Sequence, residues 1–162
     1  MEYDINIPEG DVLIPCDSQQ ISQVLTNVLK NASESVSARV DAEGEDGEKG
    51  YIGLTLSETG AASGENNSRE VKIVIEDNGV GLPKEDRDRL TEPYVTTRTK
   101  GTGLGLAIVK KIMEDHTGDL ILEDRGFGGA SISLVFRPGS NPQQLPAVGQ
   151  ENEETEMNAH GT

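Results

Sequence analysis

The sequence predicts an α+β domain built as a two-layer sandwich, in which a mixed, mostly antiparallel sheet carries helices on one face. Three observations predict it. Segments that alternate apolar and polar residues fall in hairpin-like pairs, and two segments with helical spacing separate these pairs. The chain of 162 residues also has the length of one ordinary domain. We therefore expect one domain over residues 1–139 and an acidic tail over residues 140–162.

The N-terminal part is predicted to contain two short strands and one long helix. Apolar and polar residues alternate over residues 5–7, and a second apolar run covers residues 12–14. Asp17 or Ser18 is then expected to cap a helix that reaches about Arg39. The apolar stripe of this helix consists of Ile21, Val24, Leu25, Val28, Leu29, Ala32 and Val36.

The middle of the chain is predicted to form a hairpin next to an acidic insert. Residues 41–50 are rich in Gly, Asp and Glu, and we interpret them as a solvated loop. Residues 51–56 predict one strand, and residues 71–75 alternate as a second strand that ends at Asp77. Residues 58–69 are small and polar, so they are expected to be the connection between these two strands.

The C-terminal half combines an irregular excursion, a second helix and a closing hairpin. Residues 82–100 contain prolines, charges and threonines without a sustained pattern, and this excursion is longer than an ordinary loop. A helix is predicted from Leu104, and Gly118 suits the left-handed position that follows a helix. Residues 120–122 and 132–136 predict the two strands of the closing hairpin.

The charge of the chain is strongly negative but unevenly placed. A formal net charge of −15 argues against binding to nucleic acid or to an anionic membrane. Acidic residues gather in residues 41–70 and 140–162, so the charge belongs to solvated segments and identifies no partner. The tail has little to bury, and we expect it to be disordered and, like the insert at residues 41–50, dispensable for folding.

The sequence shows no apolar run near the roughly 18 residues of a membrane span. We expect a cytoplasmic, monomeric piece of a longer protein that makes no membrane contact of its own. The single cysteine, Cys16, excludes an intramolecular disulfide and fits a reducing compartment. Because it lies in an apolar strand-like run, we expect it to be a small buried residue.

Residues 101–106 read Gly-Thr-Gly-Leu-Gly-Leu and lie directly before the second predicted helix. Glycines at every second position let the backbone approach a ligand closely. The successive N–H groups and the N-terminus of the helix then attract an anion. Arg98 and Lys100 precede the loop and could meet a polyphosphate. The ordinary alternative is a glycine-rich turn with solvated cations beside it.

Asp77, Gly79 and Gly81 follow the end of a predicted strand. A carboxylate acceptor, followed by two residues that let a flat ligand approach the backbone, suits the amino group of adenine as donor. The alternative is a plain Asp-Gly turn that leaves the strand.

Asn27 and Asn31 lie four residues apart on the first predicted helix, so their side chains project from the same edge. A neutral amide oxygen can ligate Mg²⁺, which takes only one or two protein ligands beside substrate phosphates. The alternative is a pair of amides at the surface or bonded to neighbouring backbone. Lys30 and Glu34, which are also four residues apart, predict an exposed ion pair.

In combination these segments resemble the ATP-binding catalytic domain of bacterial two-component sensor histidine kinases, within the wider superfamily that includes gyrase and MutL. Four motifs are similar to those of the family: residues 23–32 to the N box, 77–81 to the G1 box, 92–98 to the F box and 101–106 to the G2 box. Their order and spacing match over about residues 5–137. Residues 90–97 and 107–116 look most similar to nitrogen-regulation kinases of the NtrY type, and less so to the NtrB type.

The resemblance implies the two-layer Bergerat ATP-binding fold, with ATP or ADP and Mg²⁺ as ligands. Asn31 would coordinate Mg²⁺, Asn27 would approach the phosphates or the metal, and Asp77 would accept the adenine amino hydrogen. The other implied nucleotide contacts are Gly79, Gly81, Arg98, Lys100, Gly101, Thr102, Gly103, Leu104, Gly105 and Leu106. Residues 84–100 would form the ATP lid, mobile until the γ-phosphate orders it, and Ser131 would approach the adenine.

The implied activity is transfer of the γ-phosphoryl group to a His on the separate dimerisation domain of a parent sensor kinase, with a response regulator downstream. Hydrolysing members of the superfamily place a Glu four residues before the metal Asn, where this chain has Asn27, an amide that cannot act as a general base. His116, which is expected to cap a helix end, and His160, in the tail, are not in an acceptor context. Two other functions stay open: an ATPase of the same fold, and a nucleotide-sensing module without transfer.

Three positions depart from the family pattern. Thr91 stands where many members have an aromatic residue, and Tyr94 replaces the usual Phe. Glu34 lies where several members place a Lys near the nucleotide. We interpret Tyr94 either as an anchor that holds the excursion against the core or as ordinary loop packing.

Overall fold

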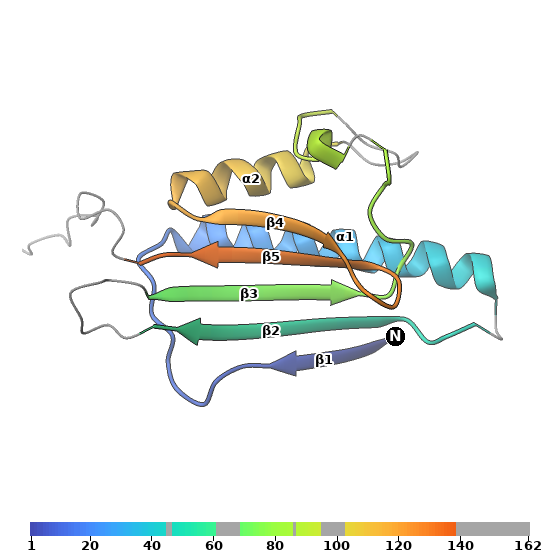
Figure 1. Ribbon diagram of the computed structural model, residues 1–162, viewed down its shortest axis with the longest axis horizontal. Coiled ribbons are helices and arrows are strands. Elements are labelled where there is room, and N and C mark those ends of the chain that lie inside the picture. Colours follow the sequence, from blue (N-terminus) through green and yellow to red (C-terminus); the bar gives the residue numbers. More distant parts are fainter. Residues whose placement is uncertain (45–46, 61–68, 86, 95–102, 139–162) are drawn as a thin grey trace, which may run out of the picture.

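The computed structural model describes residues 1–44, 47–60, 69–85, 87–94 and 103–138. One sheet has the strand order β1-β2-β3-β5-β4 (Figure 1). Its strands are β1 (Glu2–Asn6), β2 (Tyr51–Thr59), β3 (Glu70–Asp77), β4 (Asp119–Asp124) and β5 (Ala130–Phe136). β1 and β2 pair in parallel, and the other neighbours are antiparallel. The predicted mixed, mostly antiparallel sheet is therefore confirmed.

Two helices, α1 (Ser18–Glu43) and α2 (Gly105–Asp115), cover one face of this sheet. Figure 1 shows α1 behind the sheet and α2 beside β4. Side chains two residues apart share a face of a strand, so Val71, Ile73 and Ile75 face the helices together. They share one core with Val24, Val28 and Val36 of α1, Val109, Ile112 and Met113 of α2, and Ile132, Leu134 and Phe136 of β5. The predicted two-layer α+β architecture is confirmed.

The start of α1 follows the prediction. Asp17 is the N-cap, and its Oδ1 accepts hydrogen bonds from the backbone N–H groups of Gln19 at 2.9 Å and Gln20 at 3.1 Å. The helix ends at Glu43 and is followed by Gly44, with φ of 74°. Neither helix in the described part of the chain is long and apolar enough to cross a membrane.

The end of α1 corrects the predicted helix boundary at Arg39. The Arg39 guanidinium pairs with Glu43 one turn later, and its Nη2 donates to the carbonyls of Glu48 at 2.9 Å and Lys49 at 3.3 Å. The first residues of the predicted loop at 41–50 are therefore helical, and its last residues are held by hydrogen bonds. Local composition indicated a solvated loop, but it carried no sign of this long-range contact.

The strand predicted at residues 12–14 does not form. Residues 7–17 are an irregular connection. Val12 and Ile14 still pack partly against the core, whereas Leu13 is 73% exposed. The segment leads from β1, at one edge of the sheet, to the helical layer. Alternate residues of this apolar run therefore pack against the core, without a neighbouring strand to pair with.

Cys16 is exposed, so the prediction that it is buried is wrong. It lies in this irregular connection, directly before the N-cap of α1. Partial burial of the thiol raises its pKa above the ordinary value, and the negative charge of Asp17 raises the pKa further. The thiolate fraction at neutral pH is consequently smaller than for an ordinary cysteine.

We therefore expect the Cys16 thiol to be alkylated slowly, even though the residue lies at the surface. Measured against pH, the iodoacetamide reaction of the folded chain should reach its midpoint at a higher pH than the reaction of the urea-unfolded chain. Asp17→Asn removes the charge and keeps a residue that caps helices well, so it should lower this midpoint. An equal midpoint for folded and unfolded chains would contradict the prediction.

The C-terminus of α2 forms a tight hydrogen-bonded turn. The N–H of Gly118 donates to the Met113 carbonyl at 2.8 Å, and the N–H of Thr117 donates to the Glu114 carbonyl at 3.0 Å. This pair of bonds is a Schellman motif. The left-handed residue is Thr117, with φ of 53°, and not Gly118 as predicted. Gly118 meets a packing demand instead, because a Cβ there would lie 2.6 Å from the Val135 carbonyl oxygen.

His116 caps this end of α2, as predicted, and also joins the two helices. Its Nδ1 lies 2.8 Å from the carbonyl oxygen of Ile112, and its Nε2 accepts a hydrogen bond from the Asp17 N–H at 3.0 Å. A backbone N–H can only donate, so Nε2 is the acceptor and Nδ1 carries the proton. Both ring nitrogens are thus engaged in structure.

Candidate functional site

Asp77 ends β3 and is 3% exposed. Its Oδ1 accepts a hydrogen bond from the backbone N–H of Gly79 at 2.8 Å. This bond turns the chain out of the sheet while the carboxyl group stays buried at the end of the strand. Burial of a carboxylate is costly unless the group is bonded. The bond to the Gly79 N–H offsets part of that cost.

Gly79 packs directly on α1. A Cβ at this position would lie 2.2 Å from Oγ of Ser35, and the next N–H, from Val80, donates to the Ser35 carbonyl at 3.3 Å. A larger side chain would push the turn away from the helix. Gly81 follows with φ of 80°, a conformation that side chains rarely adopt. The local geometry therefore requires both glycines of the predicted motif at residues 77–81.

A third glycine, Gly129, completes the turn and was missed by sequence reasoning. It has φ of 93°, and a Cβ there would lie 1.8 Å from the carbonyl oxygen of Asp77. Gly81 faces the same residue, because a Cβ on Gly81 would lie 3.3 Å from the Gly129 carbonyl oxygen. The backbone of the β4–β5 hairpin therefore packs directly on the backbone of Asp77. In the sequence, the only sign of this close packing is the pair of glycines at residues 128–129.

Asn78, also missed, ties this turn to the start of β2. Its Oδ1 accepts from the Tyr51 N–H at 2.7 Å, and its Nδ2 donates to the Lys49 carbonyl at 2.8 Å. Its own N–H donates to the Tyr51 carbonyl at 3.2 Å. Asn78 is 4% exposed, so it holds the turn in place from within the fold.

Of the asparagine pair on α1, Asn31 lies beside the beginning of α2. A Cβ built on Gly105, the first residue of α2, would lie 3.7 Å from Nδ2 and 3.9 Å from Oδ1 of Asn31. Nδ2 of Asn27 is buried, with no hydrogen-bond partner among the residues that the structure describes. The structure thus brings Asn31 to a helix N-terminus, where backbone N–H groups attract anions.

The glycine loop before α2 is described only from Gly103 onward. Gly103 has φ of 67°, and its carbonyl accepts a hydrogen bond from the Tyr94 N–H at 3.0 Å. Leu104 precedes α2, and Leu106 packs partly against the core. The predicted contacts Arg98, Lys100, Gly101 and Thr102 lie outside the described residues.

Other predicted positions have mixed outcomes. Lys30 and Glu34 form the predicted exposed ion pair, with Nζ and Oε1 3.9 Å apart. Tyr94 is 79% exposed, so its side chain does not anchor the excursion in the core. Ser131 pairs with Glu76 and therefore lies on the face of the sheet opposite to Asp77, so the implied adenine contact is wrong. Within residues 1–44, 47–60, 69–85, 87–94 and 103–138, no group of three His, Cys, Asp or Glu residues is placed to hold a metal.

A two-layer fold with a buried Asp at a strand end, and an asparagine beside a glycine-led helix, is the arrangement expected from the resemblance to the ATP-binding domains of histidine kinases. The sequence matches the family of histidine kinase-, DNA gyrase B- and HSP90-like ATPases over residues 16–140. The chain belongs to this family. Its relatives are sensor histidine kinases, in which this domain is the catalytic part.

The similar curated proteins are nitrogen-regulation and related sensor kinases. The chain is 48% identical to nitrogen regulation protein NtrY of Azorhizobium caulinodans over 123 residues, which cover 75% of the chain and 14% of that protein. It is 41% identical to a putative NtrY-like sensor histidine kinase of Rickettsia prowazekii, over 83% of the chain and 19% of that protein. The histidine kinase/phosphatase NtrB of Rhizobium leguminosarum is 34% identical, over 88% of the chain and 35% of that protein. The chain thus spans a minor part of these relatives.

Solved structures of histidine kinases share the fold. The catalytic domain of ThkA superposes with a TM-score of 0.65 at 28% identity, covering 84% of the chain and 78% of that structure. The mycobacterial sensor histidine kinase MprB gives a TM-score of 0.65 at 25% identity, covering 85% and 84% respectively.

Proposed function

We propose that this domain binds Mg·ATP and donates its γ-phosphoryl group to a His on a separate dimerisation domain of its parent sensor kinase. The observation that supports this proposal is the proximity of Asn31 to Gly105 at the N-terminus of α2. This helix end lies on the same side of the sheet as Asp77. In this proposal, an adenine acceptor and a phosphate-binding helix end belong to one site. The parent would signal through a response regulator, either in nitrogen regulation, as the name of the relative NtrY suggests, or in redox regulation.

Asp77 would recognise the adenine through its amino group, and the glycines around it would let the flat base approach the backbone. The α2 N-terminus, with Gly103 and the preceding residues Arg98, Lys100, Gly101 and Thr102, would hold the polyphosphate. Hydrogen bonds donated by fixed backbone N–H groups need no reorganisation of the protein during phosphoryl transfer. In this arrangement the protein contributes mainly positioning and neutralisation of charge.

The asparagine pair fits a magnesium site. Mg²⁺ prefers oxygen ligands and keeps several waters, so one or two neutral amide oxygens beside phosphates suffice. Asn31 would hold the metal, and Asn27 would approach the phosphates or the metal. Nδ2 of Asn27, which is buried without a hydrogen-bond partner among the described residues, suits a donor whose acceptor, such as a phosphate oxygen, comes from outside the protein. The metal would supply neutralisation of phosphate charge.

Asn27 distinguishes transfer from hydrolysis. An amide cannot take a proton from water, so this position provides no general base for an ATPase reaction. His116 is engaged through both ring nitrogens, which argues against it as an acceptor. The phosphoryl group is therefore expected to leave for a histidine on another domain.

The decisive experiment supplies radiolabelled ATP to the chain, with and without the dimerisation domain of the parent. We expect slow, acid-labile and base-stable labelling of the acceptor domain, at a rate limited by the untethered encounter. Fast phosphate release without the acceptor would instead identify an ATPase. Nucleotide binding without any labelled acceptor would identify a sensing module.

Asp77→Asn is expected to weaken adenine nucleotides selectively, because an amide can present its NH₂ to the adenine amino donor. A lost hydrogen bond of this kind, with a donor left unpaired, costs about 1–3 kcal/mol, or roughly 5- to 150-fold in affinity. Calorimetry with Mg·ATP would measure the loss, and Asp4→Asn, on the exposed edge strand β1, tests for a general effect of carboxylate removal. Unchanged ATP affinity in the Asp77 variant would remove this role from the residue.

A further inference from the structure

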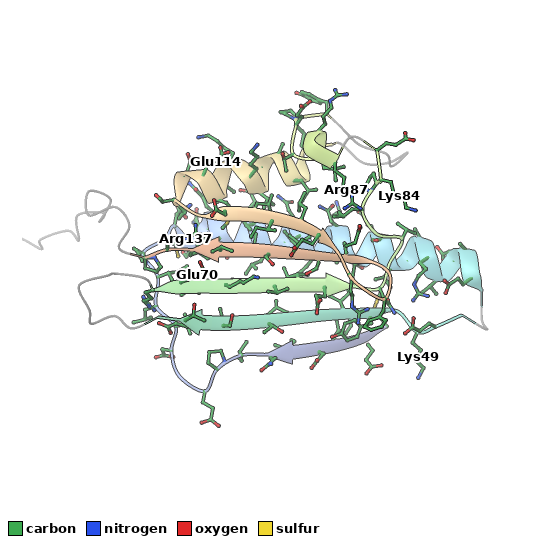
Figure 2. All side chains as sticks on the ribbon, in the orientation of Figure 1. Lys49, Glu70, Lys84, Arg87, Glu114 and Arg137 are labelled. Carbon is green, nitrogen blue, oxygen red and sulfur yellow. The ribbon has the colours of Figure 1, made fainter. Side chains whose placement is uncertain are left out.

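The first half of the excursion is fixed to the β4–β5 hairpin by one arginine. Nη2 of Arg87 donates to both carboxylate oxygens of Asp124 at 2.6 Å, and its Nε donates to the Pro83 carbonyl at 3.1 Å. Arg87 opens the short 3-10 helix η1 (Arg87–Arg89), and Figure 2 labels it between this segment and the sheet. One side chain thus closes a turn in its own segment and binds that segment to the end of β4.

The same segment reaches the glycine loop at its other end. Glu92 donates its N–H to the Arg89 carbonyl at 2.9 Å, and the N–H of Tyr94 donates to the Gly103 carbonyl at 3.0 Å. Figure 1 shows η1 near the N-terminal end of α2. A chain of contacts therefore runs from Asp124 through Arg87 and Tyr94 to Gly103, two residues before the helix N-terminus that faces Asn31.

The hairpin that carries Asp124 also carries Gly129, which packs on the Asp77 backbone. Across the turn, the Arg125 N–H donates to the Gly129 carbonyl at 3.2 Å, and Asp124 pairs with Ala130. The hairpin is consequently a common support for the adenine end of the site and for the excursion over the polyphosphate end. Among the described residues, the Asp124–Arg87 contact is a side-chain link between hairpin and excursion.

We propose that Arg87 and Asp124 are positioning residues that set where residues 83–85 and 87–94, and through Tyr94 the Gly103 carbonyl, stand relative to the polyphosphate. Neither side chain touches the nucleotide in this proposal. The inference rests on the proposed nucleotide-binding function. It adds the two residues that hold the excursion in a fixed position relative to the β4–β5 hairpin. The effect is directed to the phosphates, because the Asp77 carboxyl group is bonded to Gly79 within its own turn, and the following Asn78 is bonded to Tyr51 and Lys49, away from Arg87 and Asp124.

The test measures the affinity of Mg·ATP and of AMP for the full chain, by calorimetry and by competition. Arg87→Gln and Asp124→Asn should each weaken ATP on the order of fivefold, as expected for loss of a charge-assisted contact, and leave AMP within twofold. The ratio of ATP to AMP affinity is the readout that a purely structural role would not change. The reversed pair, Arg87→Asp with Asp124→Arg, should recover part of the lost ATP affinity.

Lys111→Gln is the matched control, because Lys111 and Asp115 form an equally short, exposed ion pair on α2, away from the excursion. All single variants should change the melting temperature no more than this control. ATP affinity unchanged in both Arg87→Gln and Asp124→Asn, or an equal loss for ATP and AMP, would overturn the inference. Failure of the wild-type chain to bind ATP, or indifference to Asp77→Asn, would instead defeat the proposed function.

Discussion

Gly129→Ala should destabilise the domain by roughly 3 kcal/mol or more, the range of severe single substitutions. Two costs add at this position. A side chain at φ of 93° is strained, and its Cβ would lie 1.8 Å from the Asp77 carbonyl oxygen and 2.8 Å from Cα of Asn78. Backbone cannot yield as a flexible side chain can, so the hairpin must move away from Asp77. Urea unfolding would measure the loss of stability, and ATP affinity should fall with it.

The same hairpin offers two matched controls. Gly128 has φ of 94° but would place a Cβ with nothing within 4 Å, so Gly128→Ala should cost only the strain of about 1–2 kcal/mol. Gly126 has neither a positive φ nor a close neighbour, and Gly126→Ala should stay within about 0.5 kcal/mol of wild type. If Gly129→Ala were no worse than Gly128→Ala, the close approach of the hairpin to Asp77 would not be what requires glycine.

Asn31→Ala should reduce phosphoryl transfer to the separate acceptor domain by at least about a hundredfold, the effect of removing one preorganised electrostatic group. The proposed metal ligand would be lost, and the amide beside Gly105 with it. Transfer of label from ATP, at saturating nucleotide, would measure the effect. The melting temperature should change little by comparison, because Asn31 lies at the edge of the apolar stripe and is only half-buried.

Three variants separate this effect from others. Asn31→Asp keeps an oxygen ligand of the same size, so it should retain more activity than Asn31→Ala. Lys30→Gln, at the exposed neighbouring position, and Cys16→Ser should leave transfer close to wild type. Full transfer by Asn31→Ala would show that the metal, or the phosphate, is held elsewhere.

The fold class was predictable because its signals are local. Alternation over residues 71–75 and the apolar stripe along α1 each reflect one face of one element, and both are confirmed. The same holds for the Asp77 turn, where the carboxyl group bonds an N–H two residues away. The four motifs in order then identified the family, and the match over residues 16–140 confirms it.

Local signals failed where a partner distant in sequence decides the outcome. The apolar run at residues 12–14 has the composition of a strand but no strand to pair with, and Cys16, in the same irregular connection, is exposed. Ser131 falls on the wrong face because the register with Glu76, set between two strands, determines its direction. Composition of a single segment contains no information on such registers.

By itself, then, the sequence determined the architecture and the residue types of the site, since periodicity and turn chemistry depend on near neighbours. Only the tertiary structure decided which residues hold that site together. Gly129 packs on Asp77, Asn78 bonds the start of β2, and Arg87 reaches Asp124. Each pair lies tens of residues apart along the chain, and only the packing of hairpin, turn and helices brings such groups within bonding distance.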